Sequence, residues 1–242
     1  MSAKKALSVV AVLAVALALG FIGFVWWKLQ PRFDPQPLPA ALVALDSVQG
    51  QRLLQGADAL ADYQPLLDAF EPQRLVSFCG VASAVIVLNA MGRHLTQRSF
   101  FTDDTDEVRS RFEVMFGGMS LPELAGLLKA HGAEVTLHHA ASSTPEQFRA
   151  ALERNLSQPG DFVLVNYERE VLGQGRGGHI SPLAAYDRDT DEVLILDTAS
   201  YKFPPTWVPV DLLFAAMSTI DPSTGQSRGF VEISPRKSAK LK

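Results

Sequence analysis

The sequence is poor in cysteine, which excludes two kinds of cross-link. Its 242 residues contain a single cysteine, Cys79, so neither an intrachain disulfide nor a multi-cysteine zinc site can form. Five histidines are present, but the adjacent His138 and His139 would point to opposite faces of a strand and so make poor co-ligands. We therefore expect no dedicated metal site.

Clustered charge is also scarce. The net charge is −4, and the one basic cluster is residues 236–242, which we expect to form a solvated basic tail. Because a nucleic-acid-binding face needs clustered basic residues, we expect no nucleic-acid partner. With 47% hydrophobic residues, the chain can bury one core, which predicts one domain with accessory segments.

A long apolar segment lies near the N-terminus. Residues 6–27 form an uncharged stretch of 22 residues, long enough to span a bilayer, and Trp26–Lys28 resembles an interfacial anchor. We predict an uncleaved inner-membrane anchor, and the two lysines before it favour a domain facing the periplasm or exterior. A cleaved signal peptide is the alternative, since Ala14–Ala18 offers small-residue sites; the protein would then be secreted.

Composition and periodicity divide the chain into four regions. Residues 1–28 hold the tail and anchor, 29–44 a proline-rich extended linker, 45–235 the globular domain and 236–242 the basic tail. The first half of the domain is helical in character. Its predicted helices are an apolar one after Cys79 and two that begin at capping boxes, Ser120–Glu123 and Thr144–Gln147.

The second half of the domain changes to strand-like runs. These runs cover residues 161–167, 179–186, 192–197 and 229–234, with a helix predicted over 208–219. The polar turn 187–191 predicts that the second and third runs form an antiparallel hairpin. We therefore expect an α+β fold, in which an N-terminal helical part packs on a C-terminal antiparallel sheet.

Three separated residues fit one catalytic unit. Cys79 would begin a helix, where the partial positive charge favours the reactive thiolate. The predicted hairpin brings the start of its first strand, His179, close to the end of its second strand, Asp197. A histidine base oriented by an aspartate would activate the thiol. The alternative at this point is a buried cysteine with two unrelated polar residues.

Two further patterns leave more than one interpretation. Gly173–Gly178 formally matches the G-x-G-x-x-G dinucleotide motif, but a strand-like run follows it, whereas the motif needs a helix. We interpret it as a flexible loop beside His179. Asp221 and Arg228 flank a turn, and they could either bind an amino-acid zwitterion or form a salt bridge that holds the loop.

Ordered motifs over about residues 65–234 resemble the phytochelatin synthase family. The resemblance is carried by Gln73 with Cys79-Gly80, by Ala82-Ser83, Val87–Ala90 and Gly178–Pro182 with Tyr186, and by Leu194–Asp197, Tyr201–Pro209, Leu212–Met217, Ile220–Gly225 and Arg228–Phe230. It implies a papain-like cysteine peptidase fold and cleavage of glycine from glutathione through a γ-Glu-Cys thioester. It assigns Cys79 as nucleophile, His179 as base, Asp197 as its orienter, Gln73 as oxyanion donor, Asp221 and Arg228 as γ-glutamyl ligands, and Asn166 and Arg169 as further pocket residues.

The resemblance also bears on the acyl acceptor. The chain is similar to short bacterial members without a cysteine-rich C-terminal domain, which implies mainly hydrolysis to γ-Glu-Cys and weaker transfer to a second glutathione, giving phytochelatin. No cofactor is expected for hydrolysis; cadmium or zinc would enter as a metal–glutathione thiolate substrate of transfer. A peptidase of other specificity and a non-catalytic thiol- or metal-binding module are the alternatives. The oligomeric state, including a homodimer, stays open.

Overall fold

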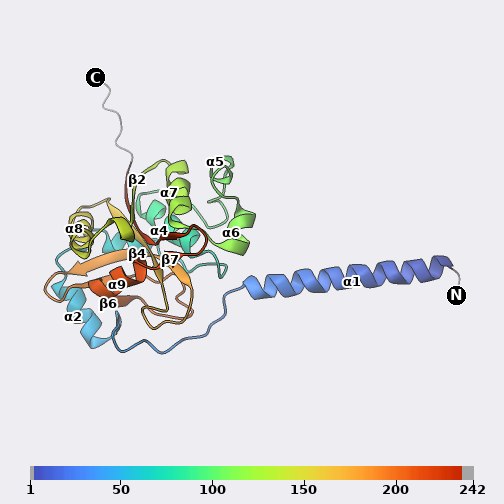
Figure 1. Cartoon of the computed structure of the whole chain (residues 1–242), viewed down its shortest axis with the longest axis horizontal. Coiled ribbons are helices and arrows are strands. Elements are labelled where there is room, and N and C mark those ends of the chain that lie inside the picture. Colours follow the sequence, from blue (N-terminus) through green and yellow to red (C-terminus); the bar gives the residue numbers. More distant parts are fainter. Residues whose placement is uncertain (1–2, 236–242) are drawn as a thin grey trace, which may run out of the picture.

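The computed structural model describes the backbone of residues 3–235 and the side chains of residues 13–235 (Figure 1). The expected basic tail, 236–242, lies outside the described residues. The helices are α1 (Ala3–Leu29), α2 (Val48–Gly56), α3 (Tyr63–Asp68), α4 (Cys79–Ala90), α5 (Asp103–Asp106), α6 (Arg111–Gly117), α7 (Leu121–Ala130), α8 (Pro145–Leu156) and α9 (Val210–Met217), with a 3-10 turn at Ala140–Ser142. The strands are β1 (Val43–Ala44), β2 (Ala133–His139), β3 (Phe162–Glu168), β4 (Gly178–Asp187), β5 (Glu192–Ile195), β6 (Thr206–Pro209), β7 (Ile220–Asp221), β8 (Gln226–Ser227) and β9 (Gly229–Pro235).

One large antiparallel sheet organises the domain. Within the described residues it has seven strands in the order β1-β6-β5-β4-β3-β9-β2, and β7 and β8 form a separate pair. The predicted hairpin is confirmed, because β4 and β5 pair antiparallel with Asp187 opposite Glu192. The expected α+β class is therefore confirmed, and the architecture is consistent with a papain-like fold. The sequence did not predict β6, which extends the sheet beyond β5.

Helices cover both faces of this sheet. Along β3, Phe162 and Leu164 belong to one hydrophobic core with α4 and α7, whereas Val163 and Val165 belong to a second core with α8 and α9. The alternation follows from the two-residue period of a strand, which places successive side chains on opposite faces. A sheet buried on both faces gives the residues at its strand ends a rigid support.

The predicted capping boxes begin two of these helices. The Ser120 side chain accepts the N–H of Glu123 at the start of α7, and the Thr144 side chain accepts the N–H of Gln147 at the start of α8. In each case the third helical residue bonds back to the cap, so two donors that lack an intrahelical partner are satisfied. Both predicted helix starts are confirmed.

Helix α4 is fixed directly against strand β4. Its residues Gly80–Leu88 are buried, and the Ser83 hydroxyl donates to the carbonyl of Ile180 at 2.9 Å. Gly80 allows the close approach, because a Cβ there would lie 3.2 Å from Cδ1 of Ile180 in β4 and 2.5 Å from the sulfur of Met119. This packing places the first residue of α4, Cys79, beside the start of β4.

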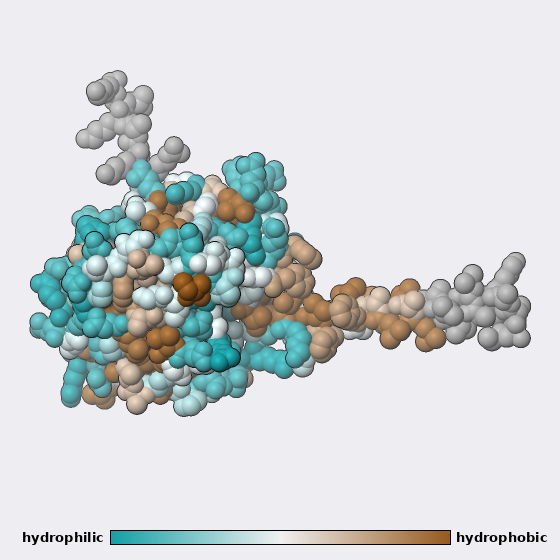
Figure 2. Space-filling view, viewed as in Figure 1, coloured by the Kyte–Doolittle hydropathy of each residue, from teal (hydrophilic) through white to brown (hydrophobic). Residues whose placement is uncertain are grey.

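Helix α1 extends away from the sheet and exposes apolar side chains, seen as a hydrophobic surface in Figure 2. Among the described residues, however, no helix is both long and apolar enough to cross a membrane. The membrane span predicted over residues 6–27 is therefore not supported. Its first part, residues 6–12, lies outside the residues whose side chains are described.

The segment after α1 follows the surface of the domain. The N–H groups of Asp34 and Gln36 donate to the carbonyls of Tyr201 and Lys202, at 3.0 and 2.9 Å. The expected proline-rich spacer, 29–44, therefore includes residues that are hydrogen-bonded to the loop after β5.

Candidate active site

Cys79 is the first residue of α4 and is partly buried. Burial raises the pKa of its thiol, but hydrogen bonding and charge from His179, the N–H of Ile180 and the charge of Arg169 outweigh that effect. The pKa of Cys79 therefore lies below that of an ordinary thiol. The first N–H groups of a helix have no intrahelical acceptor, so the start of α4 also favours negative charge. The site thus favours the nucleophilic form of cysteine.

His179 links Cys79 to Asp197, as the hairpin predicts. Its Nε2 lies 2.9 Å from Oδ1 of Asp197, which leaves Nδ1 as the ring nitrogen that hydrogen-bonds to Cys79. Burial and the charge of Arg169 lower the pKa of His179. The charge of Asp197 and the hydrogen bonds to Asp197 and Cys79 raise it by more than that, so the pKa of His179 lies above its ordinary value. A lowered thiol pKa and a raised imidazole pKa together favour a thiolate–imidazolium pair.

Arg169 lies behind this pair and fixes Asp197. One of its terminal nitrogens donates to both carboxylate oxygens, at 2.7 and 2.8 Å, and its other terminal nitrogen donates to Gln174 at 2.6 Å. Burial raises the pKa of Asp197, but His179 and Arg169 hold it well below its usual range. The prediction placed Arg169 in the substrate pocket. The structure instead directs it at Asp197, because a buried carboxylate needs a charged partner.

Gln73 is buried behind the segment that leads to Cys79. Its amide nitrogen contacts the carbonyls of Leu75 and Val76, at 3.1 and 2.9 Å, and the hydroxyl of Tyr201 at 3.3 Å. Because a buried amide must satisfy both of its N–H groups, the donor predicted for an oxyanion is here directed at the chain itself. Gln73 therefore holds the segment in this structure, and its oxyanion role stays a prediction.

Cys79 and His179 open onto a cleft of about 350 Å³. The cleft brings together Cys79 and His179 with three of the residues predicted to bind substrate, Asp221, Arg228 and Asn166. Its other lining residues are Val76, Ser77, Phe116–Met119, Gly178, Ile180, Pro222 and Ser223. One cavity thus brings together a thiol, an imidazole and a pair of opposite charges.

Arg228 is held by three acidic or amide groups. Its Nη1 donates to Asn166 at 3.2 Å and lies 3.5 Å from Asp221, and its Nη2 donates to Glu168 at 2.9 Å. Its Nε finds no acceptor within the described part of the chain, although only 6% of the residue is exposed. Glu168 was not predicted from the sequence. The sequence does contain a pattern that could have indicated it, because Asn166 and Glu168 are two residues apart and therefore share one face of an otherwise apolar strand.

Metal ligation has little support in this part of the chain. Within the described residues, no group of three or more His, Cys, Asp or Glu side chains is placed to hold a metal ion. His138 instead lies 2.8 Å from Glu232, and Nδ1 of His139 lies 2.6 Å from the carbonyl of Ser227.

Comparison with known proteins covers nearly the whole domain. The family model described as phytochelatin synthase matches residues 33–230. Glutathione gamma-glutamylcysteinyltransferase 1 of Triticum aestivum is 36% identical over 213 residues, which cover 84% of this chain and 42% of the relative. Glutathione gamma-glutamylcysteinyltransferase 1 of Arabidopsis thaliana is 32% identical over 207 residues, with 82% and 42% covered.

A fungal relative extends the same pattern. Glutathione gamma-glutamylcysteinyltransferase of Schizosaccharomyces pombe is 28% identical over 219 residues, covering 86% of this chain and 52% of the relative. The chain thus spans about half the length of these curated relatives or less. The matched region includes every site residue from Gln73 to Arg228.

The lowered pKa of Cys79 predicts its reactivity toward iodoacetamide. Only the thiolate reacts, so the rate–pH profile should have its midpoint well below the value of about 8.5 for a free thiol. In His179→Ala the midpoint should move up, because the hydrogen bond and positive charge that stabilise the thiolate are lost. Mass spectrometry of the singly alkylated protein measures both profiles without ambiguity, since the chain has one cysteine. Coinciding profiles would contradict the His179 contact.

The Arg169–Asp197 pair predicts that Asp197→Asn lowers stability as well as turnover. The substitution leaves the Arg169 guanidinium buried without its carboxylate, which typically costs about 3–5 kcal/mol in the free energy of unfolding. The double variant Asp197→Asn/Arg169→Gln should recover part of that loss without recovering turnover. Urea unfolding and steady-state assays measure the two effects. A stable, inactive Asp197→Asn would show that Arg169 does not depend on Asp197.

Proposed function

The chain belongs to the phytochelatin synthase family, and from this premise we propose that it cleaves glycine from glutathione through a γ-glutamylcysteinyl thioester on Cys79. The observation that carries the proposal is the single cleft that joins Cys79 and His179 to Asp221 and Arg228. The relatives are named glutathione gamma-glutamylcysteinyltransferases, which supports the choice of substrate.

The first half of the reaction forms the thioester. The Cys79 thiolate attacks the carbonyl carbon of the amide that joins cysteine to glycine, and N–H groups at the start of α4 stabilise the oxyanion. The His179 imidazolium then donates its Nδ1 proton to the leaving amine, and glycine departs. Asp197 stays ionised and keeps the imidazole oriented, as an aspartate does in a catalytic triad.

The second half of the reaction removes the acyl group. Water gives a proton to His179 as it attacks the thioester, which releases γ-Glu-Cys and restores the Cys79 thiolate. The amine of a second glutathione can attack in the same way, which extends the peptide and yields phytochelatin. We take hydrolysis as the main outcome and transfer to a second glutathione as the weaker one. Metal ions such as cadmium or zinc belong to the transfer step as glutathione thiolate complexes, that is, as substrate.

The charges of the cleft fit the γ-glutamyl end of glutathione. This end carries an ammonium and a carboxylate on one carbon, so it needs one group of each sign close together. Asp221 supplies a carboxylate, and Arg228 supplies a buried guanidinium whose Nε has no acceptor in the described structure. A substrate carboxylate would satisfy that N–H, and charge-assisted bonds of this kind are the stronger hydrogen bonds in proteins. An α-linked peptide would not present both charges there.

The proposed mechanism predicts a covalent intermediate. The full-length protein incubated with glutathione and quenched in acid should carry an adduct of the γ-Glu-Cys mass on Cys79, whereas Cys79→Ala should carry none. Intact-mass spectrometry detects the adduct, and product analysis with and without cadmium measures the ratio of hydrolysis to transfer. Equal glycine release from α-linked peptides would identify a peptidase of other specificity. Absence of both adduct and turnover would favour a thiol- or metal-binding module.

Gly178 provides a separate test of substrate binding. A Cβ at this position would lie 2.4 Å from Nη1 of Arg228, so Gly178→Ala should displace that guanidinium while the backbone stays in place. We expect the KM for glutathione to rise about tenfold or more, since a charged hydrogen bond is lost. The Tm should fall as well, because the displaced guanidinium loses its bonds to Asn166 and Glu168. Gly56→Ala is the matched control, because its Cβ would meet only an ordinary contact at 3.4 Å. An unchanged KM in Gly178→Ala would remove Arg228 from the binding site.

A further inference from the structure

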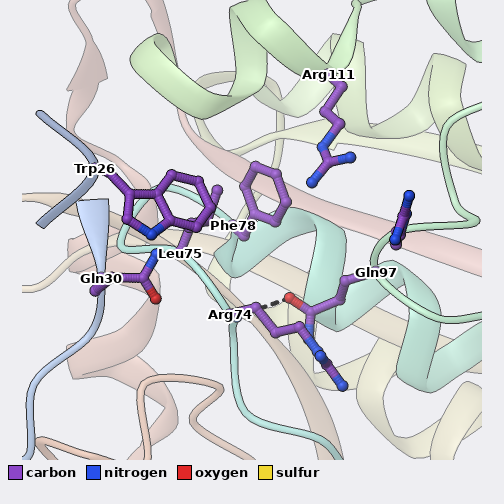
Figure 3. A pocket seen from close by; sticks show the side chains of 8 residues that line it. Trp26, Gln30, Arg74, Leu75, Phe78, Gln97 and Arg111 are labelled. Atoms are coloured by element: carbon purple, nitrogen blue, oxygen red, sulfur yellow. Dashed lines mark hydrogen bonds between the residues drawn. The ribbon is translucent and has the colours of Figure 1, made fainter. Parts of the chain in front are cut away.

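A second cavity, also of about 350 Å³, lies where the end of α1 meets the domain (Figure 3). Its lining residues are Trp26, Gln30, Arg74, Leu75, Phe78, Gln97, Arg98 and Arg111. Among the described residues, it has no lining residue in common with the catalytic cleft. We call this cavity the arginine pocket.

The segment Arg74–Cys79 forms the wall between the two cavities. Its residues divide between them: Arg74, Leu75 and Phe78 line the arginine pocket, and Val76, Ser77 and Cys79 line the catalytic cleft. A molecule held in the arginine pocket would therefore contact the nucleophile-bearing segment on the side opposite the substrate.

The charge of the arginine pocket is positive and largely unneutralised. Three arginines line it, and no aspartate or glutamate of the described chain does, although the whole chain has a net charge of −4. Arg74 lies 4.0 Å from Glu71 and its side chain is 70% exposed, so that pair is weak. Arg98 and Arg111 form no ion pair within the described residues. Like charges gathered in this way repel one another and are stabilised by a bound anion.

The pocket is preorganised by one buried side chain. The Gln97 amide accepts the N–H of Arg74 at 2.8 Å, the dashed line in Figure 3, and donates to the carbonyl of Pro72 at 2.8 Å. These bonds fix the backbone that carries Arg74. The rings of Trp26 and Phe78 form the apolar side of the cavity, with the guanidinium of Arg111 directed toward the space beside Phe78 (Figure 3).

We propose that the arginine pocket binds a phosphate group. Guanidinium groups bind phosphate oxygens in pairs of parallel N–H bonds, and two or three of them match the charge of a phosphate better than that of one carboxylate. The group has two chemical sources, a soluble phosphate compound or the headgroup of a phospholipid near the apolar helix α1. Both present the same phosphate oxygens to the guanidinium groups that line the pocket.

The test measures thermal unfolding of the full-length chain in inorganic phosphate, at constant ionic strength set with sodium chloride. A ligand that binds only the folded state raises the Tm. The dependence of the Tm on the phosphate concentration gives the concentration at which half of the folded protein is occupied. That concentration should increase at least tenfold in Arg98→Gln/Arg111→Gln. It should stay unchanged in Arg52→Gln, which removes an exposed arginine of α2 outside the pocket. Arg98→Lys/Arg111→Lys retains the charge and should bind with intermediate affinity.

A second arm distinguishes the two sources. Wild type should bind phosphatidylglycerol vesicles more tightly than phosphatidylcholine vesicles if the ligand is a headgroup, and the glutamine double variant should lose that preference. A response to inorganic phosphate alone identifies a soluble ligand, and a vesicle preference alone identifies a headgroup. Equal responses of wild type and the double variant in both arms would overturn the proposal.

Discussion

The buried ion pair between Arg169 and Asp197 is the interaction on which the rest of the site depends. Only 2% of Asp197 is exposed, and a carboxylate at such depth keeps its charge only beside a partner of opposite sign. Because Arg169 supplies that partner, Asp197 stays ionised and orients His179. His179 in turn lowers the pKa of Cys79. The reactivity of one thiol thus depends on a guanidinium that does not contact it.

The segment between Gln73 and Cys79 is the second feature that fixes the position of Cys79. Two buried glutamine side chains, Gln73 and Gln97, hydrogen-bond to its backbone or to the residues that precede it. Gln73 bonds to the carbonyls of Leu75 and Val76, and Gln97 bonds to the residues just before them. Two buried amides therefore fix a short loop that would otherwise be free to move. The loop separates the cleft beside Cys79 from the arginine pocket, so Cys79 lies on a wall between the two proposed binding sites.

The elements that the sequence predicted well are those with local causes. The helix after Cys79, the capping boxes at Ser120 and Thr144 and the β4–β5 hairpin each follow from residues within one turn or one strand. The insertion of β9 between β2 and β3 and the pairing of β6 with β5 were not predicted. The pairings of β9 join segments far apart in the chain, and the period of a strand does not say which neighbour it will take.

By itself, the sequence determined the α+β class and the approach of His179 to Asp197, because a tight hairpin is fixed by local chemistry. The packing of α4 on β4, a tertiary contact, brings Cys79 to His179. Only the tertiary structure decided where Arg169 and Gln73 point. Gln73 was predicted to donate to an oxyanion and Arg169 to line the substrate pocket, and in the structure both side chains bond to buried groups of the protein. The physical reason is that a buried polar side chain bonds to whichever partner the packing brings within reach, and packing depends on contacts across the whole fold.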